Sequence, residues 1–140
     1  MLATSNLTVS IKNEVSEVLG LNEELSKFFQ RHNVPREVVL DIHLCVEEIL
    51  LNTISYGYKD LGEHEIRVRL DFLGDRLEIR IIDDGQPFNP LLARPPDIEA
   101  TMEHRRIGGL GIHLVRNLMD RMEYLRVEDL NELRLTKLLD

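Results

Sequence analysis

The sequence predicts an α+β fold, a two-layer sandwich in which helices cover one face of a mixed, mainly antiparallel sheet. Apolar residues recur at helical spacing in two consecutive segments, residues 15–33 and 35–58. Apolar and charged residues then alternate in residues 66–72 and 77–82, which is typical of a hairpin with one solvated face. A further helix and two alternating stretches follow a proline-rich segment. Strands grouped on both sides of helices favour a layer of helices packed on an antiparallel sheet.

The length and composition of the chain limit its class. A chain of 140 residues is expected to form one domain, residues 1–140, around a single core. Its net charge of −8 argues against nucleic acid as a partner, because basic clusters that neutralise phosphates are missing. No apolar run approaches the roughly 20 residues that span a bilayer, and the first residues lack a signal-peptide pattern. We therefore expect a cytoplasmic protein that does not contact the membrane.

The N-terminal half is predicted to form a strand, two helices and the start of a hairpin. Residues 5–11 are β-branched and partly alternating, which predicts the strand. Asn13 is expected to cap the first helix, with Val15 on its apolar face. Pro35 ends that helix and begins the next one, because proline fits the first turn of a helix.

The C-terminal half contains a long irregular segment before its last helix and hairpin. Residues 86–107 hold four of the five prolines and are predicted to be a loop, since loops of this length are usually lids or binding loops. A helix is expected to follow, up to about Met122. The alternating stretches 122–128 and 133–138 then predict two strands joined by a turn at Asp129–Asn131.

The helix predicted for residues 35–58 carries two polar side chains beside its apolar stripe. At about 100° per residue, Ile49, Asn52 and Tyr56 lie on the same stripe. Glu48 lies roughly 40° from Asn52 and one turn before it, whereas Glu47 points to the opposite side. Glu48 and Asn52 are therefore expected at the edge of the core.

Burial of an amide and a carboxylate needs compensation, because each loses hydrogen bonds to water. One explanation is that backbone groups or water satisfy Glu48 and Asn52. The other is a hard cation, since amide and carboxylate oxygens suit Mg²⁺ shared with substrate phosphates. The pair alone does not choose between these explanations.

Two further motifs have functional and structural interpretations. Gly109 and Gly111 precede or open a helix, where unpaired amides and the helix dipole favour phosphate, although glycines here also simply form turns. Asp83 and Gly85 follow a strand, where an acid could accept a hydrogen bond from the exocyclic amine of adenine or simply belong to a turn.

Taken in chain order, these motifs resemble those of a known superfamily. The strings VEEILLNTISYGY, DDGQPFNP and GGLGIHLVRNLMD resemble the N, G1 and G2 boxes of the GHKL (Bergerat, histidine-kinase-like) ATPases. The chain is short and has no neighbouring phosphoacceptor helix, which makes it similar to the anti-sigma-factor serine/threonine kinases of bacterial partner-switching systems. The resemblance covers nearly the whole chain and implies a two-layer sandwich of the GHKL type.

The resemblance also assigns residues to roles. It implies ATP as substrate and Mg²⁺ as cofactor, with Asn52 as the magnesium ligand and Glu48 as the general base for the substrate hydroxyl. Asp83 would accept a hydrogen bond from the adenine amine, and Gly85 would leave room for the adenine ring. The phosphates would meet the backbone amides at the start of the last helix, and residues 86–107 would be the ATP lid. The residues of that helix start are Gly109, Leu110 and Gly111.

The chain departs from the superfamily pattern at Pro87, which stands where a second glycine is common. Proline fixes φ and removes an amide donor, so the first hinge of the lid is expected to be stiff. Arg105 and Arg106 are the candidates for replacing the lost phosphate contact.

The resemblance implies a kinase that acts as an anti-sigma factor and phosphorylates an anti-sigma-factor antagonist of the STAS type. A sigma factor would be the competing partner, and a homodimer is possible because the first strand is expected at a sheet edge. Two alternatives remain open at this point. One is a non-catalytic module that binds proteins in an ATP- or ADP-dependent way, and the other is a detached histidine-kinase ATP-binding domain.

Overall fold

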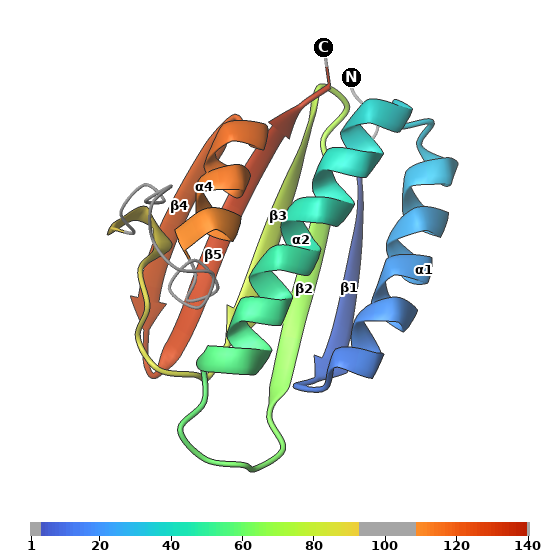
Figure 1. Cartoon of the computed structure of the whole chain (residues 1–140). Coiled ribbons are helices and arrows are strands. Elements are labelled where there is room, and N and C mark those ends of the chain that lie inside the picture. The colour runs from blue at the N-terminus through green and yellow to red at the C-terminus, as the bar shows by residue number, and fades with distance from the viewer. Residues whose placement is uncertain (1–3, 93–108, 140) are drawn as a thin grey trace.

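The computed structural model describes residues 4–92 and 109–139 as one sheet covered by helices on one face (Figure 1). The predicted order of elements is confirmed, with a short 3-10 helix η1 after β3. The elements are β1 (Ser5–Lys12), α1 (Val15–Arg31), α2 (Arg36–Tyr56), β2 (Glu65–Phe72), β3 (Arg76–Asp83), η1 (Pro90–Leu92), α4 (Gly109–Leu118), β4 (Arg121–Val127) and β5 (Leu130–Leu138).

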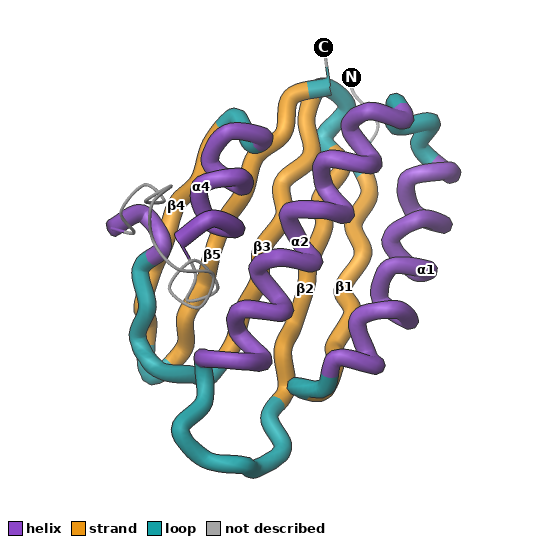
Figure 2. Tube along the Cα trace, in the orientation of Figure 1, coloured by secondary structure: helices purple, strands orange, loops and turns teal. Residues whose placement is uncertain are grey.

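The sheet has the strand order β1-β2-β3-β5-β4, and each pairing between these strands is antiparallel. β1 therefore lies at one edge, as expected, and β4 lies at the other. The helices α1, α2 and α4 lie side by side over one face, and α2 is between the other two (Figure 2). This arrangement confirms the predicted α+β sandwich, and no parallel pair accompanies the antiparallel ones among the described strands.

The core lies between the helices and the sheet because each strand alternates its side chains between two faces. Along β3, Leu77, Ile79 and Ile81 are buried against the helices, and the residues between them are partly exposed. Cys45 of α2 is fully buried and has no disulfide partner, which agrees with its position on the apolar stripe. No helix within residues 4–92 or 109–139 is long and apolar enough to cross a bilayer.

Both hairpin turns place residues in the left-handed region. Gly74, at φ 91°, occupies it in the turn between β2 and β3, which suits a residue without Cβ. Between β4 and β5, Glu128 and Asp129 both have positive φ, as the tight turns of two-residue hairpins require. The second turn therefore lies earlier than the predicted Asp129–Asn131 turn, and Asn131 belongs to β5.

Three local predictions about the helices are wrong. Asn13 does not cap α1, because its side chain bonds the Gly62 carbonyl and the His64 amide instead. Val15 and Tyr56 were expected on apolar faces but are 58% and 51% exposed. Each lies in a terminal turn, where a helix has less of the molecule beside it to pack against.

Candidate nucleotide-binding site

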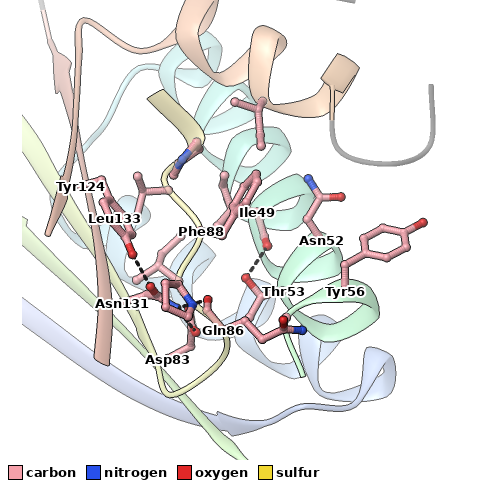
Figure 3. Close-up of a pocket in the computed structure, with 15 residues that line it drawn as sticks. Ile49, Asn52, Thr53, Tyr56, Asp83, Gln86, Phe88, Tyr124, Asn131 and Leu133 are labelled. Atoms are coloured by element: carbon pink, nitrogen blue, oxygen red, sulfur yellow. Dashed lines mark hydrogen bonds between the residues drawn. The ribbon is translucent and has the colours of Figure 1, made fainter. Parts of the chain in front are cut away.

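A cavity of about 220 Å³ opens between α2, the ends of the central strands and the segment that follows β3. Its lining includes Asn52 and Tyr56 from α2, Asp83 from β3, and Asn131 from β5. Figure 3 shows Asp83 and Asn131 together on one side of the cavity and Asn52 with Tyr56 on the other. Phe88 also lines it, so a ligand would meet apolar surface as well as these polar groups.

Asp83 occupies the end of β3 with little contact to solvent. Its side chain faces the helices because it continues the inward alternation of β3, and the residue is only 8% exposed. Its Oδ1 accepts hydrogen bonds from the amide of Gly85, at 2.8 Å, and from Nδ2 of Asn131, at 2.9 Å. Burial raises the pKa of Asp83, and these two hydrogen bonds partly oppose that shift because they stabilise the carboxylate.

Gly85 is held closely between backbone segments. A Cβ placed on it would lie 2.6 Å from the carbonyl oxygen of Gly57, the residue that caps α2. The next amide, that of Gln86, donates to the same carbonyl at 2.7 Å. A glycine at position 85 therefore lets the chain after β3 run directly against the end of α2.

Asn131, Tyr124 and Arg126 complete this side of the site, and none of the three was predicted. Arg126 donates to the Gly85 carbonyl at 2.8 Å, and the Tyr124 hydroxyl donates to Oδ1 of Asn131. The signal for Asn131 was available, since it lies at even spacing before Leu133 and Leu135, the inward residues of β5. Asn131 was missed because the sequence analysis assigned it to the turn between the last two strands.

Glu48 and Asn52 lie together at the opposite side, against the start of α4. A Cβ on Gly111 would lie 2.5 Å from Oε2 of Glu48 and 3.6 Å from Nδ2 of Asn52. Glu48 is half-buried, whereas its neighbour Glu47 is exposed. The structure therefore brings Glu48, Asn52 and Gly111 together, as the resemblance implies for a phosphate site.

The side-chain amide of Asn52 is not satisfied by hydrogen bonds to the rest of the described protein. Its Nδ2 is buried and makes no hydrogen bond within the described residues, which is costly for a polar atom. Rotation about the last side-chain bond exchanges the amide nitrogen and oxygen, so the group can present either atom to a ligand. An amide oxygen beside a carboxylate suits Mg²⁺, and this pair of residues fits the implied cofactor.

The remaining predicted residues lie at the start of α4 or outside the described part of the chain. Gly109, Leu110 and Gly111 form the first turn of α4, where backbone amides have no partner within the helix. Arg105 and Arg106 lie outside the described residues, as do residues 93–107 of the predicted lid. The first part of that segment is described, and Pro87 lines the cavity.

The fold and the cavity define a class of single-sheet domains in which a helix start lies beside an amide and a carboxylate. A family model, the histidine kinase-like ATPase domain, matches residues 11–137, so the chain belongs to that family. Within it, the chain groups with the serine-protein kinases named RsbW. It is 30% identical over 124 residues to RsbW of Halalkalibacterium halodurans, covering 86% of this chain and 74% of that protein.

Other relatives agree with this grouping. The chain is 32% identical over 100 residues to the serine-protein kinase RsbW of Listeria monocytogenes, covering 69% of this chain but only 64% of the relative. A crystal structure of the RsbU and RsbW domains of Rv1364c from Mycobacterium tuberculosis matches 96% of this chain and 32% of that one. Its TM-score of 0.69 at 17% identity shows that the two share a fold.

Proposed function

We propose that the chain is an ATP-dependent serine/threonine protein kinase that acts as an anti-sigma factor and phosphorylates an anti-sigma-factor antagonist. The observation that supports it most is that Asp83 and Asn52 line one cavity. Glu48 and Gly111 lie against each other beside Asn52. RsbW relatives carry the name serine-protein kinase, and this gives the phosphoryl acceptor as a serine hydroxyl.

Adenine is assigned to the side of Asp83. A buried carboxylate that still has an accepting oxygen can bind the exocyclic amine of the base, and Phe88 offers apolar surface to the ring. Gly85 keeps this side narrow by drawing the backbone against Gly57. The base would therefore be recognised by one charged hydrogen bond in a largely apolar setting.

The phosphates are assigned to the start of α4. The amides of Gly109, Leu110 and Gly111 have no acceptor within the helix, and together with the positive end of the helix dipole they favour anions there. Asn52 would hold Mg²⁺ through its amide oxygen, which accounts for an otherwise unsatisfied buried group. When bound, Mg²⁺ neutralises charge that accumulates on the phosphates.

Glu48 is assigned the proton of the acceptor hydroxyl. The hydroxyl oxygen would form a bond to the γ-phosphorus of ATP while the bond to the bridging oxygen breaks and ADP leaves. The Glu48 carboxylate lies against Gly111, which places it beside the proposed phosphate site. Removal of the hydroxyl proton there would favour transfer, as general bases do in other phosphotransferases.

The partners are proposed from the same family relationship. The phosphoryl acceptor would be an antagonist of the STAS type, and a sigma factor would compete for the kinase in the cytoplasm. Phosphorylation adds about two negative charges to the antagonist, and repulsion from a kinase of net charge −8 would favour its release. β1 is an edge strand of the described sheet, and a second copy could pair with it to form a homodimer.

The test is incubation of the chain with labelled Mg-ATP and candidate antagonists from the source cell. The proposal expects label on a serine or threonine of one antagonist. A non-catalytic binding module would leave every protein unlabelled but would still change its partner between ATP and ADP. Label on a histidine would instead indicate a detached histidine-kinase domain.

A further inference from the structure

The two oxygens of the Asp83 carboxylate have different environments. Oδ1 accepts two hydrogen bonds, one from the Gly85 amide at 2.8 Å and one from Asn131 Nδ2 at 2.9 Å. Oδ2 accepts none from the described residues, and Asp83 lines the cavity. A ligand therefore meets a carboxylate with one oxygen already engaged and one available.

The orientation of Asn131 is fixed by its other partners. The Tyr124 hydroxyl donates to Oδ1 of Asn131, so the nitrogen of the amide must face Asp83. That nitrogen also donates to the carbonyl of Gln86 at 2.9 Å. Asn131 is 7% exposed, and its side chain cannot turn away into solvent without leaving these groups unpaired. Residues of β4 and β5 thus fix the hydrogen bond that Asn131 donates to Oδ1 of Asp83.

This difference between the oxygens distinguishes nucleobases. Adenine offers a carboxylate one exocyclic amine, which needs one accepting oxygen. Guanine offers an adjacent ring N–H and amine, and the pair is best matched by both oxygens of a carboxylate. A site whose polar groups match one hydrogen-bonding pattern rejects a ligand with the other, because buried groups are left unpaired.

We infer that Asn131 is a specificity-determining residue that restricts Asp83 to ligands with a single amine donor and thereby selects adenine over guanine nucleotides. The inference rests on the proposed function, because it assumes that the base lies against Asp83. Asn131 acts through Asp83 and is a positioning residue, and Tyr124 supports it by fixing the direction of its amide.

The experiment measures the dissociation constants of ATP and GTP, each with Mg²⁺, by calorimetry. The variants are Asn131→Leu, which removes the donor but keeps a similar volume, and Tyr124→Phe, which removes only the hydroxyl that orients Asn131. Asn6→Ala is the matched control, because Asn6 is exposed on β1. We expect the natural chain and Asn6→Ala to prefer ATP by at least about 100-fold. We expect Asn131→Leu to reduce this ratio at least tenfold and Tyr124→Phe to reduce it less.

The outcomes separate the two proposals. If the natural chain binds neither nucleotide, the proposed function fails and the inference fails with it. If it binds ATP and GTP equally, the inference alone is overturned. An unchanged ratio in Asn131→Leu also overturns it, and if that variant does not fold, an unchanged ratio in Tyr124→Phe does the same. A uniform loss of affinity for both nucleotides would mean a structural role and would contradict selection.

Discussion

The two ends of the cavity differ in how completely the protein satisfies its own polar groups. At the base end, Asp83 and Gly85 receive hydrogen bonds from residues of two other strands, Asn131 and Arg126. At the phosphate end, Asn52 has a buried nitrogen without a partner within the described residues. Internal hydrogen bonds therefore hold Oδ1 of Asp83 at the base end and leave Oδ2 for a ligand. At the phosphate end, the buried nitrogen of Asn52 depends on a ligand for a partner.

This contrast predicts that substitutions at the two ends affect different properties, stability at one end and catalysis at the other. Substitutions at the base end break contacts that hold α2, β3 and β5 together, so they should cost free energy of unfolding. Side chains at the phosphate end make few hydrogen bonds to the rest of the protein. Their substitution should therefore lower activity and leave the free energy of unfolding nearly unchanged. Strained or unsatisfied groups of this kind are typical of functional sites.

The largest effect is expected for Glu48→Gln. The amide keeps the shape of the side chain but cannot accept the hydroxyl proton, so phosphoryl transfer should fall by about 10²–10⁴-fold. ATP affinity and the unfolding midpoint should stay close to those of the natural chain. Glu47→Gln is the matched control, because Glu47 is exposed. Equal activity of the two variants in a single-turnover assay would contradict the assignment of the base.

Gly85→Ala should have the next largest effect, on stability. The added methyl group would lie 2.6 Å from the Gly57 carbonyl oxygen, and a backbone atom cannot move aside without displacing the end of α2. Overpacking of this kind costs roughly 1–3 kcal/mol. Urea unfolding monitored by circular dichroism measures the loss. Gly20→Ala, with open space around its position, is the control and should not destabilise the chain.

Gly111→Ala, in contrast, should lower activity more than stability. Its methyl group would meet Oε2 of Glu48 at 2.5 Å, but a carboxylate at the end of a flexible side chain can move away. We expect less than about 1 kcal/mol of lost stability, since alanine also favours a helix, and roughly a tenfold loss of phosphoryl transfer. Destabilisation as large as that of Gly85→Ala, with full activity, would show that the two ends do not differ.

The smallest effect is a pH dependence of stability at His64, in the loop before β2. His64 lies 2.9 Å from Asp60 and 3.0 Å from Asp84, and hydrogen bonds to these carboxylates raise the pKa of the imidazole. A raised pKa in the folded state stabilises the fold below the ordinary histidine pKa of about 6.5, and this contribution is lost as pH rises through the raised value. The natural chain should therefore lose stability relative to His64→Gln across that interval in urea titrations. Parallel curves for the two proteins would exclude the contribution.

The sequence predicted the layers, the order of elements and the side of α2 that carries Glu48, because these follow from hydrophobic periodicity together with prolines and turn residues. It could not predict contacts that depend on strand neighbours. Asn131 contacts Asp83 because β5 pairs with β3 in a register that places the two residues opposite each other. The predicted turn at Asp129–Asn131 had left Asn131 outside the strand. Similarly, Asn13 bonds a loop distant in sequence instead of the helix that follows it.

The most direct test of the account is a crystal structure with Mg²⁺ and a non-hydrolysable ATP analogue. We predict the base amine at Oδ2 of Asp83, the phosphates at the first turn of α4, and the metal ion on the amide oxygen of Asn52. A nucleotide bound in the opposite direction, with its phosphates at Asp83, or a cavity that stays empty at saturating ligand would contradict the account.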